Sequence, residues 1–217
     1  KLTYSFKDKK IINSDTLIKN KFHLSFPNKF HFDGEEILIY ENQEQNYLGV
    51  LNLNNLNIDN NQIVTGKYLD PIVIKVKDDN LLIYSYRSNH NIEFGIKHIG
   101  EDFELKETDV KYIHNTRSTR NAGKIIFEDN SIYRPGQIGD KRYGEGIVFN
   151  KLYLTEHGVE EKEFCAFKSE EIFENSTGLH TISIKNNICI LDVRIQKFNP
   201  LAFVIKIIRR IRKYVKQ

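Results

Sequence analysis

Apolar and polar residues alternate along most of this chain in runs of strand length, and four pairs of these runs resemble one another. Each pair has a polar entry residue, an apolar strand, a tight turn rich in Asp, Asn and Gly, a second apolar strand and a polar exit residue. The pairs begin at residues 23, 70, 120 and 180, so their spacing is 47, 50 and 60 residues. Strand repeats with spacings in this range predict the blades of a β-propeller.

Further strands are expected after each pair except the last. Residues 48–53, 93–98 and 146–152 fit third strands, and residues 63–65, 104–106 and 163–167 fit fourth strands. The chain opens with residues 2–6 and 10–13, which we interpret as outer strands of a further blade whose inner strands lie upstream. We therefore predict an all-β, five-bladed β-propeller over residues 1–198, with an incomplete first blade. An open β fold is the alternative.

The last segment, residues 199–217, has a different pattern. Asn199-Pro200 fits the N-cap and first position of a helix. Apolar residues then recur at helical spacing, with Lys and Arg on the other side, which predicts a basic amphipathic helix. Such a helix suits an anionic membrane surface, and packing on the propeller or on another subunit is the alternative.

The charge balance changes the expected partners. The net charge is +3, yet eight of the 32 basic residues lie after residue 193, so the remaining 24 face all 29 acidic residues. The body is mildly acidic, so we expect no nucleic-acid partner. Two cysteines give no disulfide framework, and we expect Cys165 and Cys189 to be buried. No secretory signal or membrane-spanning run is visible, which favours a cytoplasmic location, with membrane association through residues 200–217.

The repeats themselves predict where a ligand would bind. In a propeller, the inner strand of each blade starts at one end of the central channel and the next strand returns to it. We therefore expect entry and exit residues to meet on one rim, although each could instead only cap a strand end. The candidates for binding are His23, Ser25, Arg87, Arg120, Arg134, Gln137, Tyr143, His180 and Asp192.

The densest polar stretch runs from Arg117 to Gly146. Gly123 and Gly144 are expected to allow a close approach of the backbone or a positive φ. Arg120 and Arg134 could clamp a phosphate or carboxylate, whereas the glycine spacing matches no dinucleotide or P-loop motif. The histidines show no metal-ligand spacing, so we expect neither a metal nor a cofactor.

Several ordered motifs carry a family resemblance: His23-Leu-Ser-Phe-Pro27, Asp70-Pro71, Arg120-Asn-Ala-Gly123, Tyr133-Arg-Pro-Gly-Gln137, Tyr143-Gly144 and Gly178-Leu-His-Thr181. They resemble the glycosidase-like five-bladed propeller domain of glucosamine inositolphosphorylceramide transferases, over about residues 20–193. Related domains occur in bacterial proteins of surface-glycan assembly, sometimes beside a catalytic domain. The resemblance also implies an N-terminal blade segment with an Asp-Pro motif, which this chain lacks.

Three functions remain open from the sequence. The first is a sugar-binding domain of glycan or glycolipid biosynthesis that holds a carbohydrate or sugar phosphate, as a transferase or as its acceptor-binding part, beside an upstream catalytic domain. If chemistry occurs here, Glu41 or Asp70 would be the base. The second is a glycoside hydrolase using a pair among Glu41, Asp70 and Asp192, with Glu145 as a fourth candidate. The third is a non-catalytic module that docks on a membrane.

Overall fold

The fold is known from a computed structural model. It describes residues 2–5, 7–19, 21–55, 62–76, 78–88, 91–108, 111–114, 116–139, 144–155, 158–185 and 188–196. The predicted C-terminal helix lies outside the described residues. Within them, no helix is long and apolar enough to cross a membrane.

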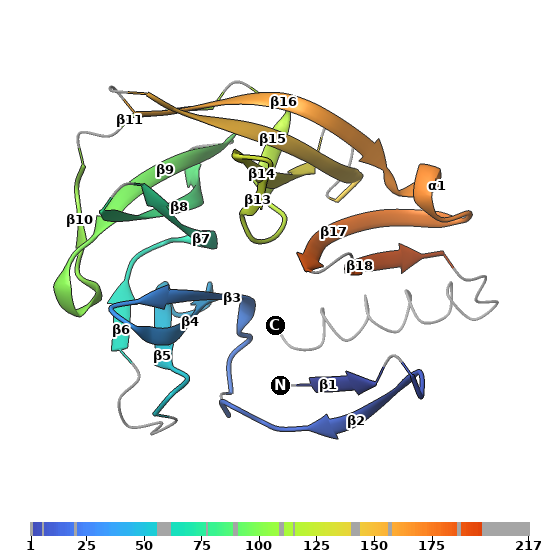
Figure 1. Cartoon of the computed structure of the whole chain (residues 1–217), viewed down its shortest axis with the longest axis horizontal. Helices are drawn as coiled ribbons and strands as arrows, with labels where there is room; N and C mark the ends of the chain where they lie inside the picture. Colours follow the sequence, from blue (N-terminus) through green and yellow to red (C-terminus); the bar gives the residue numbers. More distant parts are fainter. Residues whose placement is uncertain are drawn as a thin grey trace, which may run out of the picture.

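The described chain consists almost entirely of strands, which form five antiparallel sheets with one parallel pair at an edge. Figure 1 shows these sheets arranged in a ring, with ends of β3, β7, β13 and β17 toward its middle. The opening hairpin pairs β1 (Leu2–Ser5) with β2 (Lys10–Ser14). Blade I is β3 (Ser25–Phe32), β4 (Glu35–Asn42), β5 (Tyr47–Asn52) and β6 (Gln62–Thr65). Blade II is β7 (Leu69–Val76), β8 (Asp79–Ser88), β9 (Asn91–Ile99) and β10 (Leu105–Lys106), with a 3-10 helix at Glu101–Phe103.

Blade III is the largest sheet, and its innermost strand is interrupted. β12 (Ser118–Asn121) and β13 (Ile126–Glu128) pair in turn with β14 (Ser131–Ile138). β15 (Gly146–Thr155) and β16 (Gly158–Lys168) follow outward, and β11 (Lys111–Ile113) adds a parallel edge strand. A short helix, α1 (Ser169–Ile172), leads to blade IV, which pairs β17 (Ser176–Lys185) with β18 (Ile188–Ile195).

The tight turns inside the hairpins use the residues that the sequence suggested. Asp33 and Gly34 have φ of 48° and 79°, and Asp129 and Asn130 have φ of 45° and 59°. Two consecutive positive φ values suit the twist of a two-residue hairpin turn, and Asp, Asn and Gly tolerate them best. These local signals therefore fix the register of the inner strands.

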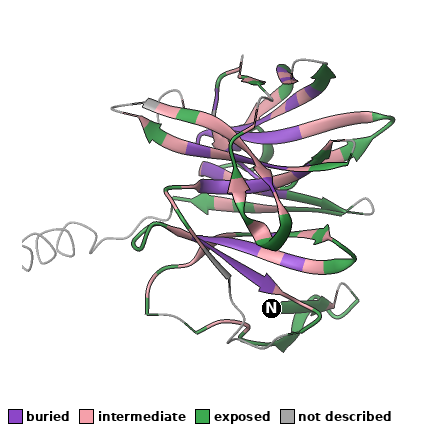
Figure 2. Cartoon of the chain, turned by 90° about the vertical axis from the view of Figure 1, so that its left-hand side faces the viewer, coloured by how far each residue is buried: buried purple, intermediate pink, exposed green. Residues whose placement is uncertain are grey.

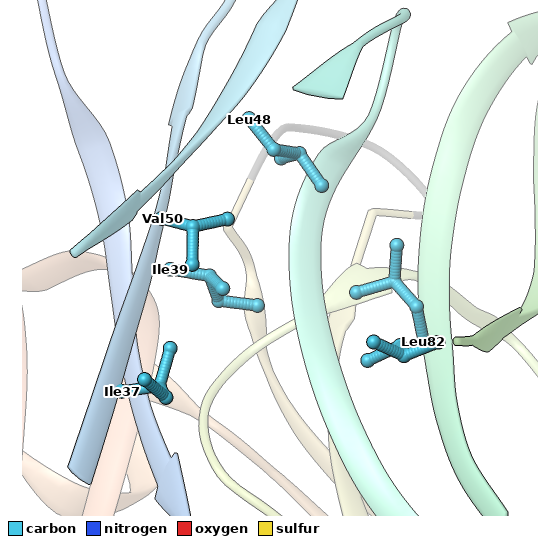
Figure 3. Packing of buried hydrophobic residues seen from close by; sticks show 6 residues of the cluster. Ile37, Ile39, Leu48, Val50 and Leu82 are labelled. Carbon is cyan, nitrogen blue, oxygen red and sulfur yellow. The ribbon is translucent and has the colours of Figure 1, made fainter. Parts of the chain in front are cut away.

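The core lies between neighbouring blades. Side chains on one face of β8, Leu81 and Ile83, pack toward blade III, whereas Leu82 on the other face packs toward blade I. A third cluster joins blades III and IV around Ala122 and Leu179. Figure 2 shows buried segments concentrated in the middle of the sheets, while the opening hairpin is exposed. Figure 3 shows the cluster between blades I and II, formed by Ile37, Ile39, Leu48, Val50, Leu82 and Ile99.

The predicted all-β propeller is confirmed, including the third and fourth strands of blades I to III. The opening segments do pair as strands, although nothing in the described residues tests whether inner strands precede them. The expectation for the cysteines is wrong, because Cys165 and Cys189 are both exposed and free. Both lie on outer strands, β16 and β18, whose outward positions face solvent.

Candidate functional site

The inner strand of every blade carries a β-bulge at the same end. The pairing register shifts between Ser25 and Asn28 in β3, between Leu69 and Ile72 in β7, and between Leu179 and Ile182 in β17. A further shift falls between Ser118 and Arg120 in β12. A bulge inserts one residue into the strand and changes the direction of nearby side chains. Four bulges at one level therefore turn side chains of four blades toward one another.

A pocket of about 610 Å³ lies at this end of the ring, and we call it the rim pocket. Eight of the residues that the repeats predicted line it, and they come from all four blades. These residues are His23, Ser25, Glu41, Asp70, Arg120, Gln137, His180 and Asp192. The topology thus brings together positions that are up to 169 residues apart in the sequence.

Glu41 ties blade I to blade II beneath the pocket. Its carboxylate accepts hydrogen bonds from Ser25 Oγ at 2.6 Å and Gln43 Nε2 at 2.8 Å. The other carboxylate oxygen accepts the backbone N–H of Asp70 at 2.7 Å, inside the β7 bulge. The residue is only 1% exposed. These partners fix the orientation of the Glu41 carboxylate and occupy three of its hydrogen-bond acceptor positions.

Asp70 extends this chain of contacts to blade III. Arg120 holds it bidentately, with Nη2 2.8 Å from Oδ1 and Nε bonded to Oδ2. Asp70 is 3% exposed and has a φ of 46°, which follows from its place in the bulge. Burial raises the pKa of Asp70 to about 6 and Glu41 adds to the rise, while the charge and hydrogen bonds of Arg120 oppose it. The site therefore holds a carboxyl group that titrates close to neutral pH.

Blade IV contributes two residues that contact each other, His180 and Asp192. Asp192 Oδ1 accepts the backbone N–H groups of His180 at 2.9 Å and Thr181 at 2.6 Å, which satisfies the β17 bulge. Its Oδ2 lies 3.3 Å from His180 Nδ1. The Asp192 side chain remains 50% exposed, so it can also contact a ligand.

Two glycines hold this side of the site in place, as the sequence predicted. Gly144 has a φ of +68°, and a Cβ there would overlap the His180 ring. Gly123 has a φ of +154°, and a Cβ there would overlap the carbonyl of Ile182. Close backbone approach at both positions leaves room only for hydrogen.

Arg134 does not belong to the site. It is fully buried and donates from Nε to Glu161 Oε2 at 2.7 Å and from Nη2 to Glu161 Oε1 at 2.8 Å. Further bonds run to Asn121 Oδ1 at 2.9 Å and Ser118 Oγ at 2.6 Å, and the guanidinium lies 4.6 Å from the centre of the Phe94 ring. The expected role of Arg134 as a ligand clamp is therefore wrong, because its donors are used inside the protein.

The other arginine positions also differ from the expectation. Arg120 lines the rim pocket but already holds Asp70, so it is not a dedicated phosphate clamp. Arg87 lies outside the rim pocket because β8 runs on to Ser88, and it lines a neighbouring pocket instead. Tyr143 lies outside the described residues.

Sequence reasoning missed five residues that line the rim pocket: Phe26, Pro27, Gln43, Glu44 and Thr181. Each follows a predicted residue closely along the chain. Phe26 and Thr181 lie within bulges, and Gln43 and Glu44 follow the exit residue of β4. Reading two residues beyond the end of β4 would have found Gln43 and Glu44, whereas Phe26, Pro27 and Thr181 lie within strands next to predicted residues.

The charge of the rim pocket is predominantly negative. Four carboxylates line it, from Glu41, Glu44, Asp70 and Asp192, against the single guanidinium of Arg120. Among the described residues, no group of three His, Cys, Asp or Glu side chains has the arrangement of a metal site. The pocket offers hydrogen-bond donors and acceptors of mixed type beside the Phe26 and Pro27 side chains, a composition that suits a polyhydroxylated ligand.

Two solved structures are similar to this chain. The β-xylosidase RS223 has a TM-score of 0.51 and 13% identity, over 82% of this chain and 71% of that one. A glycoside hydrolase family 43 β-xylosidase/α-arabinofuranosidase from a compost microbial metagenome, solved with xylotriose, has a TM-score of 0.48 and 14% identity, over 76% of this chain and 62% of that one. No curated protein matches significantly. The first similarity shows the fold alone.

A family model gives the more specific result. It matches residues 12–179, which cover the end of β2, blades I to III and the start of blade IV. The chain belongs to the family described as glucosamine inositolphosphorylceramide transferase 1, N-terminal.

Proposed function

We propose that this chain is a sugar-binding propeller domain that acts in the biosynthesis of surface glycans or glycolipids, as a transferase or as the acceptor-binding part of one. The observation that carries the proposal is the rim pocket, where eight polar residues from four blades converge. A volume of about 610 Å³ lies within the usual range for small-molecule sites. The family to which the chain belongs supports a role in glycan transfer.

Binding and catalysis make different demands on this pocket. Glu41 and Asp70 are held by Ser25, Gln43 and Arg120, so they orient the pocket wall well. The same contacts occupy hydrogen-bond acceptor positions on both carboxylates. If a transfer step occurs here, we assign the proton transfer to Asp70, because it lines the pocket and its pKa of about 6 lies near neutral pH.

A glycan array followed by calorimetry tests sugar binding. His23 and Gln43 are exposed and line the pocket, so His23→Ala and Gln43→Ala should each weaken binding by about three- to tenfold without loss of fold. The matched control is His31→Ala, because His31 lies in β3, the strand that follows His23, and has a 72% exposed side chain outside the pocket. Equal affinity of all three variants would refute the rim pocket as the site.

The glycoside hydrolase alternative rests on the carboxylates of the same pocket. A retaining enzyme needs two carboxyl groups about 5–5.5 Å apart and an inverting one about 6.5–9.5 Å, with one free to protonate the leaving group. Asp70 is paired with Arg120, so it is not free to protonate the leaving group. We expect no turnover of nitrophenyl glycosides, and steady release of nitrophenol that is abolished by Asp70→Asn would establish the hydrolase.

The location of the protein stays a proposal that rests on its sequence. We infer a cytoplasmic protein that associates with anionic membranes through residues 200–217, beside a catalytic domain upstream. Flotation with vesicles containing phosphatidylglycerol should recover the full chain and not a chain ending at residue 199. Equal recovery of both would exclude this role of the segment.

A further inference from the structure

A second pocket adjoins the rim pocket at the junction of blades I and II. It has a volume of about 350 Å³, and we call it the side pocket. Gln43 lines both pockets, so the two lie next to each other on either side of this residue. The side pocket lies between the end of β4 and the segment that leads into β7, with Arg87 from the end of β8.

The base of the side pocket is held by internal contacts. Asn42 is 1% exposed and accepts the backbone N–H of Gln45 at 3.0 Å, while its amide donates to Tyr47 Oη at 3.1 Å. Gly66 donates its N–H to the Asn46 carbonyl at 2.8 Å, and its missing side chain lets the Tyr68 ring pack against the backbone. The side pocket is therefore preformed.

The charge of the side pocket is opposite to that of the rim pocket. Lys67 and Arg87 line it and are exposed, and its described lining residues include no carboxylate. Within the described part of the chain, neither cation takes part in an ion pair. The rim pocket, in contrast, has four carboxylates against one guanidinium that is already paired. An anionic group is thus disfavoured in the rim pocket and favoured next to it.

We propose that the side pocket binds the anionic group, a phosphate or a carboxylate, of a glycan whose uncharged sugar occupies the rim pocket. Arg87 provides a planar guanidinium for two oxygens, and Lys67 provides a second positive charge. Gln43 lies between the two subsites and can hydrogen-bond the linking atoms. This inference rests on the proposed sugar-binding function and adds the charge class and orientation of the ligand.

Calorimetry on the full chain with three probes tests the inference: a neutral hexose disaccharide, the same disaccharide carrying a phosphate, and the same disaccharide with a uronic acid. Comparison of the affinities of the phosphate-bearing and uronate-bearing probes identifies which anion is preferred. Arg87→Gln and Lys67→Gln should each weaken the anionic probes by about three- to fivefold and leave the neutral probe unchanged. Lys75→Gln is the matched control, because Lys75 is an exposed strand residue of blade II outside both pockets. Raising the salt concentration should reduce the advantage of the anionic probes.

The outcomes separate this inference from the function on which it rests. If the neutral probe binds, and neither anion binds more tightly or responds to Arg87→Gln and Lys67→Gln, the side pocket has no such role while the sugar site stands. If none of the probes binds, and His23→Ala is also without effect on any glycan of the array, both proposals fail.

Discussion

Arg134 shows how one residue can look like a ligand contact and instead hold the protein together. Its side chain has no exposed surface, yet it keeps a full charge because Glu161, Asn121 and Ser118 accept its hydrogen bonds. Glu161 in turn accepts from Tyr112 Oη at 2.8 Å and pairs with His114. Arg134 lowers the pKa of Glu161 to about 2, with help from His114, although burial alone would raise it. The stability from this carboxylate is therefore present above about pH 4.5 and is lost as the pH falls toward 2.

Replacement of Arg134 should act on stability and not on ligand contact. Arg134→Ala leaves the Glu161 carboxylate buried without its main partner, so we expect the free energy of unfolding to fall by about 3–5 kcal/mol. Urea denaturation measures this. Lys162→Ala, at a 59% exposed position on the same strand as Glu161, should change stability by less than about 0.5 kcal/mol. A stable Arg134→Ala variant that loses only glycan affinity would contradict the structural assignment.

Asp70 should make the protein less stable as the pH rises through the weakly acidic range. Its pKa is 3.8 in an unfolded chain and about 6 in the fold, so the unfolded state releases the proton first. Relative to Asp70→Asn, the wild type should lose about 2–3 kcal/mol of stability between pH 4 and 6.5 and show a constant difference above that. Denaturant titrations at several pH values measure the difference, with Asp129→Asn in an exposed turn as a control for removing one carboxylate. If the stability of the wild type relative to Asp70→Asn instead rose between pH 4 and 6.5, the raised pKa of Asp70 would be rejected.

At the scale of elements, the bulges decide where the pocket residues point. Strand patterns could be predicted because apolar alternation and Asx/Gly turns are local signals, as at Asp33-Gly34. The bulges could not be predicted from the sequence. Asp70 and Phe26 have φ of 46° and 49° directly before prolines, and the residue types at these positions do not indicate this rare conformation. The blade register alone was enough to predict that entry and exit residues of the four blades meet on one rim. Predicting which side chains reach it needed the bulges and the true ends of β8.

Gly144 gives an element-scale test of the His180 position. Gly144→Ala combines a backbone strained at φ +68° with a methyl group that overlaps the His180 ring, so we expect ligand affinity to fall by about tenfold or more. Gly34→Ala is the matched control: it has a φ of +79°, and a Cβ there meets nothing within 4 Å. The control should lose about 1–2 kcal/mol of stability and keep its affinity. Denaturation measures the backbone strain in both variants, and calorimetry measures whether displacement of the His180 ring weakens ligand binding. Equal affinities of the two variants would show that His180 does not shape the pocket.

At the scale of the whole molecule, stability comes from the hydrophobic clusters packed between neighbouring blades, which we call seams. Leu81 and Leu82 are adjacent in β8 and pack into two different inter-blade clusters, which explains why β8 is apolar on both faces. The sequence predicted the ring because four hairpins repeat one order of apolar strands and Asx/Gly turns. The burial of Arg134 could not be predicted from its own motif, because its main partner Glu161 lies 27 residues away on another strand.

Weakening one seam should therefore lower the stability of the whole ring. Leu82 is 1% exposed between blades I and II, and Leu82→Ala should cost about 2–5 kcal/mol. Leu2→Ala, at a 65% exposed position of the opening hairpin, should cost less than about 0.5 kcal/mol. A single calorimetric transition shifted to lower temperature is expected, and two separate transitions would show that the blades unfold independently.

The residues at the four bulges differ in whether they bond across blades or within one hairpin, and this difference affects how the domain can diversify. Glu41, Asp70 and Arg120 link three blades, so a change at any of them disturbs its neighbours. His180 and Asp192 satisfy each other within one hairpin. Relatives that prefer different sugars can be expected to vary first in that hairpin, which makes it the natural place to graft new selectivity.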